Sequence, residues 1–517
     1  MTRMEYGGML RLDALLARAA VSAPHRDAVI CQNQTWSYAE VHNRARRLAG
    51  ALAALGVQKG TRVAYWAGNR AEFVEMLFGV SMVGAIASPL DHWWTWSDAE
   101  VALAQIRPTV FIVGGPQAAQ AAGHRDALEA AGVERVLCLD DCPAEPIFDS
   151  YAHSLASATR LRTPTPVVGT DPAVIFFTSG STGRSKGAVH THGSLVATAR
   201  TQSMELGLRD GERSLHCLPL FASCLEQLIP LTLMGATHII LPQFDASAAW
   251  DAVLKHGVTH SNAVPTTLRR LLDAAPGRIP PLLRSVSYAS ERMPEPLITA
   301  LVERMPAVGF VQFYGMIEQL CLTVSGAADQ LRKIATVGRP MLGAEMYLQS
   351  EDGEPAGVGE SGEIIARSPS LFAGYWEDEA ATARVMLGGW MRTGDVGRFD
   401  DDGFLVLEGR LKDMIKSGGI TVIPAEVEHV LMGHPQVSEA VVLGMADENW
   451  GEAVHAFVTV APGALVGEAD LKAFCHERLA GYKRPKVIHI VPELPRTGIG
   501  KVARRAVRDR ALASRAQ

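Results

Sequence analysis

The stretch that decides the fold is "FFTSGSTGRSKGAVHTH", Phe176 to His192. It follows an apolar run typical of a buried strand, and it gathers glycines and hydroxyls around Lys186. It departs from the common nucleotide-binding pattern G-x-x-x-x-G-K-[ST], because Ser185 stands where the second glycine belongs and Gly187 follows the lysine. Glycines still let backbone N–H groups turn toward an anion. We therefore predict a phosphate-binding loop of another kind, with a flexible surface turn as the alternative.

Side chains of the same loop add donors for a polyphosphate. Hydroxyls donate hydrogen bonds, and a lysine supplies a mobile positive charge. The hydroxyl residues are Thr178, Ser179, Ser181, Thr182 and Ser185. The glycines that permit a positive φ are Gly180, Gly183 and Gly187. An ordered run of hydroxyls after an apolar strand argues against a mere linker.

Length and composition limit the classes of protein to consider. A chain of 517 residues exceeds one core, so more than one domain is expected. The net charge of −6 gives no global basic field for nucleic acid. The seven cysteines are scattered without a C-x-x-C pair, so neither a zinc site nor a disulfide framework is predicted, and a reducing, cytoplasmic setting fits. We find neither a signal peptide nor an uncharged apolar run of membrane-spanning length.

Strand and helix patterns alternate along most of the chain. "RVAYWA" and "PTVFIVG" read as buried strands, and "AEVHNRARRLAGALAALGV" reads as a helix that stops at Gly56. This alternation predicts an α/β fold with largely parallel sheets covered by helices. From about residue 336 short alternating strands predict a β-rich subdomain, with a hairpin turn at "DDDG". We predict a large domain over 1–411 and a small, mobile α+β domain over 412–517.

Five motifs occur in a characteristic order: "TSGSTGRSKG", "YGMIE", "RTGD", "GRLKDMIKSGG" and "PRTGIGK". With them the chain, from about Leu10 to Arg505, resembles the acyl-adenylate-forming enzymes, which include acyl- and aryl-CoA synthetases, luciferase-like enzymes and peptide-synthetase adenylation domains. It looks most like an acyl-CoA synthetase. The resemblance implies that a carboxylic acid reacts with ATP to give acyl-AMP and pyrophosphate, and that the thiol of coenzyme A then displaces AMP. Mg²⁺ is the implied cofactor, and a homodimer is compatible with the resemblance.

The resemblance also implies roles for single residues. Lys186 adds charge at the departing phosphates, and Glu318 is the implied Mg²⁺ ligand. Asp395 would accept hydrogen bonds from the ribose hydroxyls, with Arg410 near the same sugar. Lys501 would bridge the substrate carboxylate and the α-phosphate. The alternatives without a catalytic role are that Glu318 caps a helix, that Asp395 is a turn residue, and that Lys501 is a solvated lysine in a basic tail. The implied ATP-binding set is Thr178, Ser179, Gly180, Ser181, Thr182, Gly183, Lys186, Ser290, Tyr314, Gly315, Asp395 and Arg410.

The same comparison extends to the small domain and to the acid. Lys412 matches the hinge about which that domain is thought to rotate between the two half-reactions. Lys416, Gly418 and Gly419 would serve the thioester step. The implied acyl-pocket residues mix aromatic and small apolar groups, which suggests an aryl or medium aliphatic acid. They are Phe221, Ala222, Glu226, Tyr288, Phe313, Tyr314 and Met316.

Several positions depart from the family pattern. Ile317 stands where threonine is usual, so a hydroxyl that reaches the α-phosphate is missing. Ala222 replaces a histidine or aromatic residue that gates the acyl pocket, and "YASERM", Tyr288 to Met293, replaces a Gly-Gly-Ala-Pro segment beside the adenine. Thr421 replaces asparagine, and Ser185 replaces proline. These departures bear on the substrate and the rate more than on the fold.

Two alternatives to a CoA ligase stay open at this point. The chain could load a carrier protein in trans, although no phosphopantetheine attachment site follows the last motif. A degenerate nucleotide-binding protein is kept in view by Ile317. The tryptophans of "DHWWTWSD", Trp93, Trp94 and Trp96, are predicted to pack at a subdomain edge.

Overall fold

The computed structural model describes residues 10–178, 185–291, 293–461, 463–496 and 502–515. The chain forms two compact units and passes between them more than once. The first unit comprises Met1–Glu345 and Arg367–Gly389, and the second comprises Met346–Ala366 and Trp390–Gln517. The predicted combination of a large α/β part and a smaller α+β part is confirmed.

An eight-stranded sheet of the first unit carries the flanks of the predicted phosphate loop. Its strands lie in the order β19-β9-β8-β4-β3-β5-β6-β7, and they are parallel from β8 to β7. β9 is antiparallel to β8 and to β19. The bounds are β3 Arg62–Trp66, β4 Ile86–Pro89, β5 Val110–Val113, β6 Arg135–Cys138, β7 Phe148–Ser150, β8 Pro172–Thr178, β9 Lys186–Thr191 and β19 Gly374–Tyr375.

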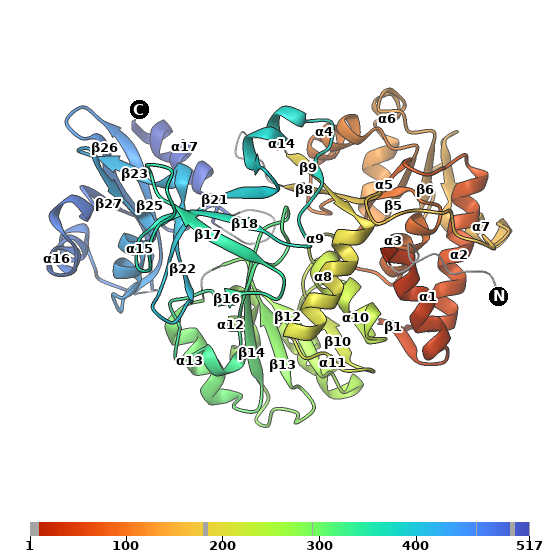
Figure 1. Ribbon diagram of the computed structural model, residues 1–517, viewed down its shortest axis with the longest axis horizontal. Coiled ribbons are helices and arrows are strands. Elements are labelled where there is room, and N and C mark those ends of the chain that lie inside the picture. The colour runs from red at the N-terminus through yellow and green to blue at the C-terminus, as the bar shows by residue number, and fades with distance from the viewer. Residues whose placement is uncertain (1–9, 179–184, 292, 462, 497–501, 516–517) are drawn as a thin grey trace. The chain divides into compact units, whose positions relative to one another are not determined.

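The second sheet of this unit has nine strands in the order β16-β15-β14-β13-β12-β10-β11-β1-β2. It is parallel from β14 to β1 and antiparallel at both edges, and Figure 1 shows β12, β13 and β14 side by side. The bounds are β1 Asp27–Cys31, β2 Gln34–Ser37, β10 Arg213–His216, β11 Thr237–Ile240, β12 His260–Ala263, β13 Ser285–Tyr288, β14 Gly309–Tyr314, β15 Thr323–Ser325 and β16 Arg339–Pro340. The short strand β20, Met386–Leu387, belongs to neither of these two sheets.

Helices cover both faces of these parallel sheets, so neighbouring side chains of one strand enter different cores. In β3, Val63 and Tyr65 join a core shared by both sheets, whereas Ala64 and Trp66 join a core on the opposite face. The helices of the unit are α1 Leu12–Ser22, α2 Tyr38–Ala54, α3 Glu72–Met82, α4 Trp96–Ile106, α5 Gly115–Ala122, α6 Arg125–Ala130, α7 Tyr151–Ser157, α8 His192–Glu205, α9 Leu220–Ser223, α10 Ile229–Leu233, α11 Ala246–His256, α12 Pro265–Asp273, α13 Glu295–Arg304 and α14 Glu379–Val385.

The second unit contains two smaller sheets. β17 Glu345–Gln349, β18 Gly362–Arg367, β21 Trp390–Phe399 and β22 Leu405–Arg410 form one of them. The predicted "DDDG" turn joins β21 to β22, where Oδ1 of Asp400 accepts the N–H of Phe404 at 2.8 Å. The other sheet and its helices comprise β23 Ile415–Ser417, β24 Ile420–Val422, β25 Val437–Asp447, β26 Gly451–Val460, β27 Val487–Ile490, α15 Pro424–Met432, α16 Glu468–Arg478 and α17 Arg504–Arg515.

The two units do not coincide with the predicted domains of 1–411 and 412–517. Residues 346–366 and 390–411 group with the C-terminal residues, because β18, β21 and β22 pair with one another. The position of the hinge at Lys412 stays a prediction. No helix among the described residues is long and apolar enough to cross a membrane.

Candidate active site

The predicted phosphate loop joins two antiparallel strands. β8 ends at Thr178 and β9 begins at Lys186, and these residues face each other across the pair. Gly187 is required by packing, because a Cβ there would lie 2.7 Å from Cγ2 of Ile175. The predicted phosphate ligands that lie outside the described residues are Ser179, Gly180, Ser181, Thr182 and Gly183.

Tyr375 links Lys186 to Glu318. It lies on β19, whose pairing with β9 sets Tyr375 opposite Ala188. Nζ of Lys186 lies 4.9 Å from the centroid of the Tyr375 ring, within the range of a cation–π interaction. The Tyr375 hydroxyl donates a hydrogen bond of 2.7 Å to Oε1 of Glu318. Two residues predicted to act on the phosphates and the metal are thus held by one aromatic side chain.

The backbone of the "YGMIE" segment is fixed from two sides. Nε2 of His190, on β9, lies 2.6 Å from the carbonyl oxygen of Ile317. Burial lowers the pKa of His190 to about 4, so the neutral ring donates this hydrogen bond near pH 7. The N–H of Phe372 donates to the carbonyl oxygen of Glu318 at 2.8 Å. The half-buried Ile317 side chain packs against the core that the two sheets share.

Two further residues that are predicted to bind ATP have unusual backbone requirements. A Cβ on Gly315 would lie 1.6 Å from the carbonyl oxygen of Leu320, so only glycine fits there. Ser290, just after β13, has φ 79°, a region that favours glycine. Both residues follow the carboxyl ends of parallel strands, and Tyr314 is itself the last residue of β14. Ligands of open α/β sheets bind at this edge.

The surroundings of Glu318 fit a magnesium ion held mainly by a nucleotide. Among the described residues no group of three or more His, Cys, Asp or Glu side chains could hold a metal. Mg²⁺ usually takes one or two carboxylates together with substrate phosphates and waters. The Tyr375 hydroxyl engages Oε1 of Glu318, which leaves Oε2 for the ion. When bound, Mg²⁺ would neutralise charge on the phosphate oxygens.

Three predicted acyl-pocket residues lie close together in the chain. Phe221 and Ala222 belong to α9, and Glu226 belongs to a π-helix, Cys224–Leu228, labelled η2. Short π-helical turns occur frequently at functional sites. Ala222 is exposed, and the half-buried Phe221 ring meets the Trp93 ring edge-on at 6.2 Å. The exposed Ala222 is therefore next in the chain to an aromatic side chain that packs against Trp93.

The remaining predicted pocket residues differ in burial. Tyr288 is 2% exposed, and its hydroxyl is hydrogen-bonded within the fold to Gln312 at 3.2 Å and to Gln330. Phe313 is 4% exposed and Met316 is half-buried. The polar end of Tyr288 is therefore committed to the interior of the nine-stranded sheet.

The other two tryptophans of the predicted cluster pack at separate places. Trp94 meets the ring of Phe177, one residue before the end of β8, at 5.8 Å. Trp96 lies in a core with its ring 6.4 Å from that of Trp66. Both tryptophans are thus used in packing within the first unit, and a place at a subdomain edge stays a prediction.

In the second unit, Asp395 and Arg410 occupy paired positions of β21 and β22. Nε of Arg410 lies 3.0 Å from Oδ1 of Asp395. Asp395 is buried, whereas the Arg410 side chain is 54% exposed. The structure thus brings together the two residues predicted to meet the ribose, and the ion pair orients the carboxylate.

The residues predicted for the thioester step form a hairpin. β23 and β24 are joined by Gly418 and Gly419, whose φ values of 58° and 79° suit a two-residue turn of the kind that favours paired positive φ. Lys416, on β23, donates from Nζ to Oγ1 of Thr421 at 2.7 Å and to Oε1 of Glu351 at 2.9 Å. Threonine in place of the family's asparagine therefore supports this lysine.

The last two predicted positions are Lys412 and Lys501. Lys412 is exposed in a short 3₁₀ turn, Leu411–Asp413. Lys501 lies outside the described residues.

Sequence reasoning missed Tyr375 and His190. His190 lies in the stretch Phe176 to His192, four residues after Lys186, but the sequence does not distinguish it from a histidine buried in a core. Tyr375 acquires its place only when β19 pairs with β9. Residues so far apart in one sequence give no local sign of that pairing.

Comparison with known proteins decides the family. The model described as AMP-binding enzyme matches residues 16–376, and the model of the AMP-binding enzyme C-terminal domain matches residues 426–501. The chain belongs to the AMP-binding enzyme family. This enzyme is 35% identical to a feruloyl-CoA synthase of Amycolatopsis over 95% of its own length and 97% of that protein. It is 34% identical to a long-chain-fatty-acid–CoA ligase of Mycobacterium tuberculosis, over 97% and 98% of the two chains.

A solved structure gives the same answer for the fold. O-succinylbenzoate coenzyme A synthetase of Bacillus subtilis, in complex with AMP, matches with a TM-score of 0.85 and 28% identity, over 96% of this chain and 98% of that one. The predicted family and fold are confirmed. The protein is an AMP-forming acid–thiol ligase, which activates a carboxylic acid with ATP and transfers the acyl group to coenzyme A.

Proposed function

We propose that this enzyme activates an aromatic carboxylic acid, and that Lys186, Glu318, Asp395, Arg410 and Lys501 carry the adenylation step. The observation that carries the proposal is the arrangement around Tyr375, which holds Glu318 by a hydrogen bond and Lys186 by its ring. A charged pair held in this way is preorganised for a polyphosphate with its metal ion.

The proposed chemistry is an in-line displacement at the α-phosphorus. A carboxylate oxygen of the acid attacks, and pyrophosphate leaves. Lys186 stabilises charge that builds up on the leaving phosphates, and Lys501 holds the attacking carboxylate against the α-phosphate. Asp395 accepts hydrogen bonds from the ribose hydroxyls, while Arg410 keeps that carboxylate oriented through the 3.0 Å contact. An enzyme accelerates such a reaction mainly by positioning the reactants and by stabilising the charge that develops in the transition state.

The choice of an aromatic acid rests on the predicted pocket and on relatives. Phe221, Trp93 and Phe313 offer aromatic surfaces, and Ala222, next to Phe221, is small and exposed. Offset aromatic contacts favour a ring over a plain alkyl chain. The similarity to a feruloyl-CoA synthase supports an aromatic acid as the substrate. The similarity to a long-chain-fatty-acid–CoA ligase makes a fatty acid the competing substrate class.

The proposal also covers location and assembly. All seven cysteines are free, and six of them are buried, which suits a reducing cytoplasm. A homodimer is proposed only as compatible with the family, and light scattering of the purified protein would test it.

The test is acid-dependent release of pyrophosphate from ATP over a panel of cinnamic, benzoic, medium-chain and long-chain acids. We expect the highest kcat/KM with an aromatic acid, and thioester formation only when coenzyme A is added. A strong preference for fatty acids would refute the acid class. Transfer to a phosphopantetheine carrier protein, but not to coenzyme A, would contradict the acceptor.

A matched pair of variants tests the site. Glu318→Gln should abolish pyrophosphate release, because it removes the carboxylate assigned to Mg²⁺. Glu295→Gln, at an exposed glutamate that begins α13, should leave the rate unchanged. Equal activity of both variants would remove Glu318 from the metal site.

A further inference from the structure

Helix α4 and the residue just before it contact the chain at both ends of the predicted phosphate loop. The Trp94 ring meets the ring of Phe177, the last residue but one of β8, at 5.8 Å. Near the other end of α4, Nε2 of Gln105 donates to the carbonyl oxygen of Ser185 at 3.1 Å. Ser185 directly precedes Lys186, where β9 begins. This one region therefore supports the ends of both strands that the loop joins.

The contact from Gln105 begins where the pairing of β9 ends. β8 pairs with β9 as far as Lys186, and β19 pairs with β9 farther from the loop. The N–H of Trp376, just after β19, donates to the carbonyl oxygen of Gly187 at 2.7 Å. Ser185 comes before the first residue of β9, so Gln105 extends the support of this strand by one residue toward the loop.

The end of α4 that carries Gln105 is itself held in place. Nε of Arg62, in β3, donates to the carbonyl oxygen of Ile106 at 2.6 Å, and its Nη2 donates to that of Arg107 at 2.9 Å. Arg107 also forms an ion pair with Glu377 at 2.7 Å, but both side chains are more than half exposed, and such pairs contribute little. The half-buried Gln105 side chain thus acts from a helix end whose position is fixed.

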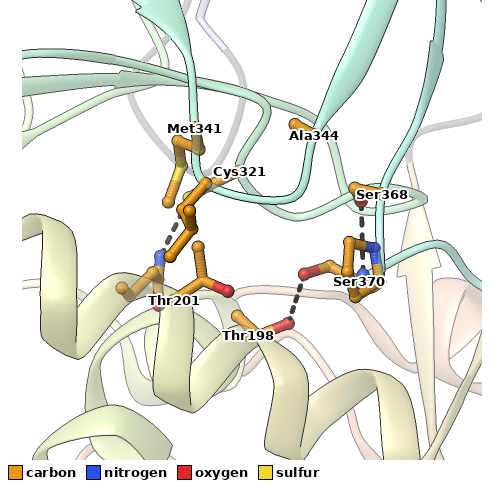
Figure 2. Close-up of a pocket in the computed structure, with 10 residues that line it drawn as sticks. Thr198, Thr201, Cys321, Met341, Ala344, Ser368 and Ser370 are labelled. Atoms are coloured by element: carbon orange, nitrogen blue, oxygen red, sulfur yellow. Dashed lines mark hydrogen bonds between the residues drawn. The ribbon is translucent and has the colours of Figure 1, made fainter.

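Tyr375, whose ring lies near Lys186, is supported by a different helix. Figure 2 shows Thr198 of α8 and Ser370 facing each other beside a small pocket, and their hydroxyl oxygens lie 2.9 Å apart. Ser370 stands in the segment that leads to β19 and Tyr375. Loss of the contact from Gln105 should therefore act on the lysine and not on the tyrosine.

We propose that Gln105 is a positioning residue for adenylation: by holding the Ser185 carbonyl oxygen, it sets the backbone from which Lys186 reaches the β- and γ-phosphates of ATP. The inference rests on the proposed function, which assigns Lys186 to these departing phosphates. A small displacement of such a group is costly, because a charge stabilises the reaction only where it is held in the right place. AMP lacks both phosphates, so Gln105 should matter for ATP and not for AMP.

The first experiment measures the binding of MgATP and of AMP by isothermal titration calorimetry, without acid or coenzyme A. Gln105→Met keeps the length and bulk of the side chain but removes the donor. We expect this variant to bind MgATP about three- to tenfold more weakly, the effect of one hydrogen bond, and to change AMP binding by less than about twofold. Equal weakening of both nucleotides would assign Gln105 to the folding of the site and overturn the inference.

The second experiment adds a matched control and a double variant. Gln349→Met, in the second unit, removes the same kind of contact, since Nε2 of Gln349 donates to the carbonyl oxygen of Gly353 at 2.9 Å, and it should change neither affinity. Lys186→Met should weaken MgATP binding by about 10- to 100-fold and spare AMP. Adding Gln105→Met to Lys186→Met should weaken MgATP binding by less than about twofold more, because the glutamine acts through the lysine. A second loss as large as in the single variant refutes this route.

The outcomes also separate this inference from the proposed function. If Lys186→Met weakens MgATP binding and Gln105→Met does not, the inference fails and the proposed role of Lys186 stands. If neither variant weakens it, that role fails and the inference fails with it. If Gln105→Met does not fold, Gln105→Ala, which lacks a donor and favours a helix, allows the same comparison.

Discussion

Tyr375 serves two charged residues with different parts of one side chain. Its ring lies under the Lys186 ammonium group, and its hydroxyl donates to Glu318. Tyr375→Phe should keep the first contact and remove only the second. Hydrogen bonds to charged groups contribute roughly 1.5–3 kcal/mol, so we expect adenylation at limiting Mg²⁺ to fall by about 10- to 100-fold. The measurement is the pyrophosphate release rate as a function of Mg²⁺ concentration.

The control for this variant is Tyr347→Phe in the second unit, whose ring meets Trp390 edge-on at 5.2 Å. It should leave the Mg²⁺ dependence unchanged. If saturating Mg²⁺ restored none of the activity lost in Tyr375→Phe, the hydroxyl would act on folding rather than on the metal ligand.

Gly315 is a second residue whose identity is dictated by its neighbours. A methyl group there would overlap the Leu320 carbonyl oxygen, since the separation would be 1.6 Å. Gly315→Ala should therefore displace the segment that carries Glu318 and remove adenylation. We also expect a stability loss of about 1–3 kcal/mol, the size usual for overpacking. Urea unfolding together with pyrophosphate release would measure both effects.

Gly326→Ala is the matched control, since nothing lies within 4 Å of a Cβ at that position and its φ is −71°. It should change neither quantity. An active Gly315→Ala variant would mean that the segment can shift without cost, against the geometry.

At the scale of elements, three parallel strands carry a buried layer of histidines. Nε2 of His216 on β10 lies 3.0 Å from Nδ1 of His238 on β11, and the other ring nitrogen of His238 lies 3.0 Å from the Thr232 hydroxyl on α10. His260 on β12 lies 3.4 Å from Oε1 of Gln227 on η2. This polar layer ties the strands to the π-helix that carries Glu226.

Burial makes this layer sensitive to acid. It lowers the pKa of His238 to about 3 and of His260 to about 4, and it also lowers that of His216. The unfolded chain binds protons on these rings from about pH 6.5 downward, whereas the folded chain does not until near pH 4. Stability is therefore complete above pH 6.5 and falls as the pH drops toward 4, by about 1.4 kcal/mol per pH unit for each histidine.

Urea unfolding between pH 7 and pH 5 checks this expectation. His260→Gln should flatten the pH dependence by about one proton, while His25→Gln, at an exposed histidine, should not. An unfolding free energy that is flat across this range would show that the layer is already protonated or open to water.

Most elements of this enzyme could be predicted because their sequence patterns are local. "RVAYWA" became β3, "PTVFIVG" became β5, and the "DDDG" turn joins β21 to β22. Each is marked by an apolar run or by turn residues next to it. The π-helix η2 could not be predicted, because no residue pattern distinguishes an i→i+5 turn from the α-helical turns of α9 and α10 on either side of it.

The residues of the candidate site also fall into two groups, those that a local motif marks and those that it does not. Glu318, Asp395 and Arg410 were found because they stand inside short ordered motifs. Tyr375 and His190 were not, because their roles depend on strand pairing and on a buried contact that join distant segments. A single sequence records neither of these.

At the scale of the whole molecule, the chain crosses between its two units after Glu345, Ala366 and Gly389. The sequence suggested a single boundary near Lys412, because a separate α+β pattern follows Arg410 and Lys412 matches the hinge of the resembled family. β18 and β21, which pair with each other, come before that boundary and group with the residues after it. Asp395 and Arg410 thus belong to the second unit, and Glu318 and Lys186 belong to the first.

The two half-reactions provide the test of how the small domain serves them. We propose that Lys501 acts only in adenylation and that Lys412 is the pivot. Lys501→Ala should slow acyl-AMP formation by about 10²–10³, the cost of removing one preorganised donor. Supplied with ready-made acyl-AMP and coenzyme A, the same variant should form thioester at nearly the normal rate.

Lys412→Pro should show the reverse pattern, because proline fixes φ near −65° and stiffens the turn. It should still release pyrophosphate with acid and ATP but transfer the acyl group slowly. Lys412→Ala is the matched control, since it removes the same exposed charge without fixing φ, and it should be nearly normal in both steps. A loss in Lys412→Ala equal to that in Lys412→Pro would assign the effect to charge. Lys501→Ala could instead slow both half-reactions equally, and Lys501 would then have no role specific to adenylation. The proposal that the small domain presents one face for adenylation and another for thioester formation would fail for this chain.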